Sequence, residues 1–114
     1  MGSNRRMDHM TWPEFKEVKT HPVIVPIGST EQHGQHLPIG TDAVLATRVA
    51  EDLAERIDGT VLPTLSYGYK SKPLSGGGPL FPGTIDMNGV TVITQMHDVL
   101  SELIADGFTK IVVM

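Results

Sequence analysis

The order of apolar runs and helical patterns along this chain predicts an α/β fold, with a mainly parallel sheet and helices on its faces. Short apolar runs that are typical of buried strands lie at residues 22–27, 60–66 and 110–114. Helical patterns separate these runs, so the elements alternate strand, helix, strand, helix, strand. Connections between parallel strands are almost always right-handed crossovers, and this alternation therefore favours one three-stranded parallel sheet.

A short first helix is predicted at Thr11–Thr20. Thr11 is a residue type that caps helices, and Pro13 suits an early helical position. Phe15 and Val18 are three residues apart and therefore share one helical face. The residues before this helix, 1–10, are interpreted as an N-terminal extension of the domain.

Two longer helices are predicted between the strands. The second helix begins at Thr41 or Asp42 and is stopped by Gly59, and the third spans Val90–Ala105 with Gly107 as its stop. Apolar residues recur along one face of each helix, which is the pattern of a helix that packs on a core. The predicted core-facing residues are Leu45, Val49, Leu53 and Ile57 in the second helix, and Val92, Met96, Val99 and Leu103 in the third.

Composition and charge exclude several classes of protein. With 114 residues and 39% hydrophobic content, the chain suits one globular domain. A net charge of −4 with scattered Lys and Arg argues against a nucleic-acid binder, which needs clustered basic residues. The chain lacks the run of about 18 apolar residues that a membrane span needs, and its start lacks the apolar stretch of a secretory signal, so a cytoplasmic protein is expected. Because there is no cysteine, any metal must be held by His and carboxylates.

A polar loop with the chemistry of a metal site follows the first predicted strand, in the sequence IGSTEQHGQHLPIGTD of residues 27–42. Glu31 and His33 are two residues apart, so in an extended segment their side chains project to the same side, and Asp42 lies where the loop turns into the second helix. This mixture of oxygen and imidazole ligands suits zinc or manganese. The alternative is an ordinary solvated loop. His36 is interpreted either as a donor that supports a ligand or as a surface residue.

The predicted topology brings three chain segments to the same end of the sheet. In open parallel sheets, the loops at the carboxyl ends of the strands collect functional groups. The polar loop leaves the first strand, a long loop leaves the second strand after Leu65, and Met114 is the tip of the third strand. Three strand ends are therefore expected to face one crevice.

The long loop at residues 67–89 is rich in Gly, Pro and Ser. Ser75, Gly76 and Gly77 can bring a hydroxyl and backbone N–H groups close to a small substrate, and the alternative is a flexible surface turn. A phosphate-binding loop is excluded because the sequence Gly-x-x-x-x-Gly-Lys is absent. Three other residues of this loop are predicted to be packed or solvated rather than catalytic: Tyr67, Tyr69 and Lys70.

Both loops resemble those of the creatininase family. GSTEQHGQHLPIGTD is similar to the metal-binding signature of the family, and YGYKSKPLSGGGPLFPGT resembles creatinine amidohydrolases in particular. The resemblance covers residues 11–114, which would form the N-terminal portion of a single layered α/β/α sandwich domain. It implies that Glu31 binds one metal ion, that His33 binds the other, that Asp42 bridges them, and that Ser75 contacts the substrate.

The resemblance also implies a function. Family members are amidohydrolases that open C–N bonds with a metal-bridging water, and zinc and manganese, or two zincs, form the metal pair. A small cyclic amide such as creatinine is the expected substrate, and the assembled unit is expected to form a homo-oligomer. The alternatives are a family member that acts on formamides or other amides, and an inactive fragment that serves as a binding or scaffold module. A dinucleotide-dependent protein is disfavoured because the glycine fingerprint is missing.

The chain departs from the family pattern at its end. Family members continue beyond the strand that matches KIVVM with an Asn-Gly-His type segment, which carries further metal ligands and substrate-binding residues. These 114 residues therefore contain one half of the expected metal shell. A second chain that carries the C-terminal part of the fold is expected as a partner, and the chain alone is expected to be an incomplete enzyme.

Overall fold

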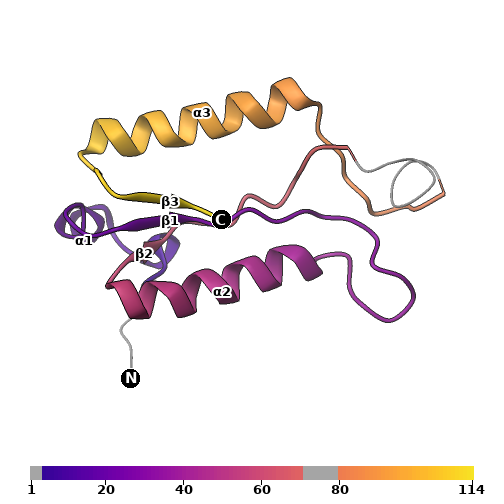
Figure 1. The fold of residues 1–114 in the computed structure, drawn as a ribbon, viewed down its shortest axis with the longest axis horizontal. Coiled ribbons are helices and arrows are strands. Elements are labelled where there is room, and N and C mark those ends of the chain that lie inside the picture. Colours follow the sequence, from indigo (N-terminus) through magenta and orange to yellow (C-terminus); the bar gives the residue numbers. More distant parts are fainter. Residues whose placement is uncertain (1–3, 71–79) are drawn as a thin grey trace.

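The computed structural model describes residues 4–70 and 80–114, and its elements follow the predicted alternation of strands and helices (Figure 1). All three strands are parallel, in the order β2-β1-β3, and α2 and α3 cover opposite faces of this sheet (Figure 1). The predicted α/β fold is therefore confirmed. The elements are η1 (Met7–His9), α1 (Trp12–Glu17), β1 (Val23–Val25), α2 (Thr41–Ile57), β2 (Thr60–Val61), α3 (Gly89–Asp106) and β3 (Ile111–Val113).

The central strand β1 is fully buried and divides the core into two layers. Successive side chains of a strand point to opposite faces of the sheet. Val23 and Val25 therefore pack in the layer that includes Leu103 of α3, whereas Ile24 packs in the layer that includes Ala54 of α2. This alternation explains why one short apolar strand supports a helix on each side.

The apolar stripe predicted for α2 is only partly correct. Leu53 and Ile57 pack against the core, but Leu45 and Val49 are 58% and 51% exposed. The strands are only two or three residues long, whereas α2 has 17 residues, so the first half of the helix extends past the sheet (Figure 1). Close packing occurs at the second half, where the small side chain of Ala54 lets the helix approach β1 and β2.

The other two helices agree more closely with the sequence pattern. The predicted stripe of α3 faces inward, with Leu103 at 3% exposure, and the helix ends at Gly107, whose φ of 104° is readily adopted by glycine. The first helix ends at Glu17 instead of Thr20, because turns replace its last predicted residues. No helix in the described ranges combines the length and apolarity needed to cross a membrane.

The residues before α1 lie along the outer edge of β2. The Val61 N–H donates a hydrogen bond to the Arg5 carbonyl at 2.8 Å, and the Arg5 guanidinium donates to the Asp58 carboxylate at 2.9 Å. This hydrogen bond, with His21 nearby, holds the pKa of Asp58 below its ordinary value. Asp58 has a left-handed φ of 54° at the end of α2, so it forms the turn that the sequence pattern assigned to Gly59.

Candidate metal centre

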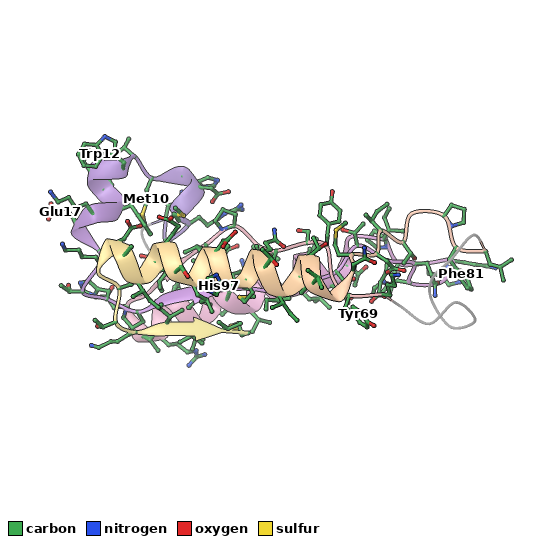
Figure 2. All side chains as sticks on the ribbon, turned by 90° about the horizontal axis from the view of Figure 1, so that it is seen from above. Met10, Trp12, Glu17, Tyr69, Phe81 and His97 are labelled. Atoms are coloured by element: carbon green, nitrogen blue, oxygen red, sulfur yellow. The ribbon has the colours of Figure 1, made fainter. Side chains whose placement is uncertain are left out.

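The loops that follow β1 and β2 meet at the carboxyl ends of the strands, as the topology predicts. The Thr30 hydroxyl donates to the Ser66 carbonyl at 2.8 Å, which joins the two loops. The Ile27 N–H donates to the Met114 carbonyl at 2.6 Å, so the end of β3 lies beside the start of the polar loop. Figure 2 shows labelled residues of the second loop, Tyr69 and Phe81, far from Trp12 at the opposite end of the molecule.

Three potential metal ligands converge in this region. Glu31, His33 and Asp42 each offer one ligand atom, and these atoms all lie within 4.8 Å of one another. His33 Nε2 is 3.0 Å from Asp42 Oδ1, and both side chains are partly exposed. The polar loop therefore brings together the three residues that the sequence predicts as ligands.

Local backbone geometry explains why residues nine positions apart meet. The Glu31 N–H donates to the Ile39 carbonyl at 3.1 Å, so the loop folds back on itself before α2 begins. The Thr41 hydroxyl and N–H both donate to the Pro38 carbonyl, which fixes the entry into the helix. Asp42 then lies in the first turn of α2, where the positive end of the helix dipole favours a carboxylate.

The surroundings of His33 orient its ring and favour positive charge. Its Nδ1 is 2.9 Å from the Glu31 carbonyl, and because a carbonyl only accepts, Nδ1 must carry the proton. Nε2 then faces Asp42. The hydrogen bond to the Glu31 carbonyl, and next the Asp42 carboxylate, raise the pKa of His33 above its ordinary value. A ring held in this way by one nitrogen presents the other nitrogen as a metal ligand.

The donor set fits zinc or manganese. Bonds of about 2.0–2.2 Å hold two ligands of a tetrahedral zinc roughly 3.3 Å apart, which is close to the 3.0 Å between His33 Nε2 and Asp42 Oδ1. If Asp42 bridged two ions, each ion would receive only two protein ligands from this group, Asp42 with Glu31 and Asp42 with His33. Neither coordination shell would be complete, so other residues must contribute to such a site.

The other residues that the sequence marks as candidates are either exposed or lie outside the described residues. His36 is exposed in the turn of the polar loop, which favours the interpretation as a surface residue. Tyr67 and Tyr69 are 51% and 66% exposed, and Lys70 is also exposed, in agreement with solvated side chains. The predicted substrate-binding residues lie outside the described residues, and their role stays a prediction: Ser75, Gly76 and Gly77.

Thr84, which the sequence pattern does not mark as functional, contacts the polar loop. Thr84 Oγ1 accepts a hydrogen bond from the Gln32 N–H at 3.0 Å. Gln32 is the residue that follows Glu31 in the chain. The Pro82–Gly83 pair before Thr84 indicates a turn, but the partner of a residue at the end of a turn is not visible in the sequence.

The fold and the site define an α/β protein with a candidate site of carboxylate and imidazole ligands at the carboxyl ends of its parallel strands. A family model described as creatinine amidohydrolase matches residues 8–114. This chain belongs to the creatininase family.

Relatives with different activities share this part of the chain. It is 39% identical over 108 residues to a creatinine amidohydrolase of Pseudomonas putida, a match that covers 92% of this chain and 42% of the relative. It is 35% identical over 88 residues to a 3-dehydro-scyllo-inosose hydrolase of Thermotoga maritima, covering 77% and 27%. A mycofactocin precursor peptide peptidase of Mycolicibacterium smegmatis is 42% identical over 71 residues, covering 57% and 27%. The chain thus spans less than half the length of these relatives.

Solved creatininase structures superpose closely on the described fold. A crystal structure of creatinine amidohydrolase matches with a TM-score of 0.90 and 37% identity, over 99% of this chain and 45% of that one. A creatininase structure labelled Mn has a TM-score of 0.88 at 36% identity, over 98% and 45% of the two chains. A mutant creatininase of Zn-Zn type has a TM-score of 0.87 at 36% identity, over 99% and 45%. Zinc and manganese forms of the fold therefore exist among its structural relatives.

Proposed function

We propose that this chain forms the N-terminal part of a metal-dependent amidohydrolase that opens a C–N bond of a small cyclic amide. The observation that carries the proposal is the convergence of Glu31, His33 and Asp42, whose ligand atoms lie within 4.8 Å of one another at the ends of the strands. The 39% identity to a creatinine amidohydrolase supports the reaction class.

The three side chains take distinct roles in this proposal. Glu31 would hold one ion, His33 would hold the other through Nε2, and Asp42 would contribute to both. Two cations at this position would lower the pKa of a shared water and polarise the carbonyl of the amide. The Glu31 carbonyl fixes the orientation of the His33 ring, and the first turn of α2 fixes that of Asp42. No nucleophilic side chain is required by this chemistry.

The rest of the metal shell is proposed to come from a segment that pairs with β3, carried by a second chain. β2 is covered along its outer edge by the N-terminal residues, but β3 forms the other edge of the sheet within the described residues. Val113 and Met114 are 45% and 38% exposed there. A parallel edge strand with apolar side chains is a surface that proteins normally cover.

Intact-mass and denaturing-gel analysis of the natively purified protein tests the partner. We expect the 12.4 kDa chain to copurify with a second polypeptide that supplies the remaining ligands. A single longer polypeptide would contradict the second chain but leave the metal site intact as a proposal. A 12.4 kDa species alone would contradict both the partner and a complete enzyme. Homo-oligomeric assembly and a cytoplasmic location remain predictions.

The substrate is proposed to be creatinine or a similar small lactam. Because the relatives include a peptide peptidase and a hydrolase of 3-dehydro-scyllo-inosose, the test is a panel and not a single compound. Creatinine, a simple lactam, a formamide, a short peptide amide and a cyclic ketone are incubated with the complete protein, and each product is measured directly. Turnover of creatinine or the lactam supports the proposal, whereas turnover of the formamide alone would contradict the cyclic substrate.

A catalytically inactive binding or scaffold module is the second candidate function. The observation that favours it is that the described residues bring together only three potential ligands at this site, too few to complete the coordination of two ions. This candidate predicts that no member of the panel is hydrolysed and that the protein retains no metal after purification.

A further inference from the structure

The later part of the Gly-rich loop holds the backbone on both sides of Glu31. Thr84 Oγ1 accepts a hydrogen bond from the Gln32 N–H at 3.0 Å. The next residue, Ile85, donates its N–H to the Thr30 carbonyl at 2.9 Å. Consecutive residues of one segment thus fix the residues immediately before and after the candidate ligand.

A turn built by the sequence Phe81-Pro82-Gly83-Thr84 brings Thr84 to this position. The Thr84 N–H donates to the Phe81 carbonyl at 3.3 Å, and Gly83 has a φ of 95°, which is the conformation that glycine adopts behind proline in a type II turn. Gly83 also lies against Ile39, since a Cβ added to this glycine would be 3.2 Å from Ile39 Cδ1. The turn is therefore packed as well as hydrogen-bonded.

Two further hydrogen bonds hold the peptide groups on either side of the Glu31 Cα atom. The Ile39 carbonyl accepts the Glu31 N–H at 3.1 Å, and the Glu31 carbonyl accepts from His33 Nδ1 at 2.9 Å. Both peptide groups of Glu31 are consequently engaged, one on the Ile39 side and one on the Thr84 side. The direction in which the Glu31 carboxylate leaves the backbone depends on these two peptide planes.

We propose that Thr84 is a positioning residue, whose hydroxyl oxygen fixes the Glu31–Gln32 peptide and thereby aims the Glu31 carboxylate at the metal site. This inference rests on the proposed function, because it assigns Thr84 a role only if Glu31 binds metal. Without the oxygen, the half-buried Gln32 N–H loses its acceptor, and the Glu31–Gln32 peptide loses one of the two hydrogen bonds described here. Supporting residues of this kind typically change metal affinity by about 10 to 100-fold.

Zinc affinity of the complete protein, measured by competition with a chromogenic chelator, tests the role. Thr84→Val keeps the shape of the side chain and removes the oxygen, and it is expected to weaken zinc binding by about 10 to 100-fold. Thr84→Ser keeps the oxygen and is expected to bind zinc like the wild type. Thr94→Val removes a hydroxyl from the exposed face of α3 and is the matched control, with unchanged affinity expected.

The absorption spectrum of the cobalt-substituted protein gives a second readout, which loss of stability alone would not move. A shifted spectrum is expected in folded Thr84→Val and a wild-type spectrum in Thr84→Ser. If Thr84→Val binds zinc like the wild type, or Thr84→Ser is as weak as Thr84→Val, the role of the oxygen is disproved. If the wild type itself binds no metal, the proposed function fails and this inference fails with it.

A measurement on the wild type keeps the proposal testable even if Thr84→Val does not fold. Hydrogen exchange of the Gln32 amide is expected to be slow, because this N–H is bonded to Thr84 Oγ1 in a half-buried position. Exchange at the rate of an exposed loop amide, in protein whose α3 amides remain protected, would overturn the inference.

Discussion

Asp42→Ala is expected to reduce amide hydrolysis by the complete protein to the limit of detection, whereas His36→Ala is expected to retain most of it. Asp42 is 3.0 Å from His33 Nε2 and is proposed to bridge both ions, so its loss leaves each ion with one ligand from the described group instead of two. His36 is exposed, so its replacement is expected to change little. Even if His36 supported a ligand, its loss would lower metal affinity by about 10 to 100-fold and would not remove a ligand.

Asp42→Asn sharpens this comparison. Asparagine preserves the size of the side chain at the start of α2 but removes the negative charge, so folding should be retained while metal is lost. Steady-state kinetics and metal content are measured together for the three variants, after circular dichroism has shown that each is folded. Equal losses in Asp42→Asn and His36→Ala would show that the ligands are misassigned.

Gly28→Ala is expected to destabilise the fold and to displace the polar loop. A Cβ at residue 28 would be 2.6 Å from Ala43 Cα and 2.8 Å from Ala43 N, closer than real side-chain atoms approach. These are backbone atoms of the first turn of α2, next to Asp42, so they can move only if the helix moves. Overpacking of this kind costs about 1–3 kcal/mol of unfolding free energy.

Gly40→Ser is the matched control for Gly28→Ala. It adds a side chain at the other end of the same loop, where nothing lies within 4 Å of an added Cβ and φ is −91°. Gly40 is the N-cap residue of α2, a position at which serine is favoured. Urea unfolding is expected to leave Gly40→Ser near the wild type and to lower the midpoint of Gly28→Ala, which should also lose zinc affinity. Equal midpoints for the two variants would contradict the packing argument.

The sequence predicts which segments form helices and strands better than it predicts what packs against them. The apolar stripe of α3 and its stop at Gly107 are both found, because periodicity and glycine chemistry are local properties. The prediction that Leu45 and Val49 face a core is wrong, because a periodic stripe indicates an apolar face but not what covers it. The short strands leave that half of α2 uncovered.

The same difference holds for the candidate site, where local sequence patterns identify the candidate ligands but not the contacts between residues far apart in the chain. Glu31 and His33 are recognised from adjacent chemistry, and Asp42 from its place at the start of a helix. The contact between Thr84 and Gln32 joins residues 52 positions apart, and no local pattern indicates such a partner. The sequence therefore indicates which residues are candidate metal ligands, whereas the structure adds a residue that hydrogen-bonds the backbone beside one of them.

Metal analysis of the complete protein, purified without chelators, tests whether Glu31, His33 and Asp42 belong to a two-metal site. The proposed function predicts about two zinc or manganese ions per site. It also predicts that dialysis against a chelator removes both the metal and the hydrolytic activity, and that both return when zinc or manganese is added. A protein that is isolated without metal, and that remains without metal after zinc is added, would contradict it.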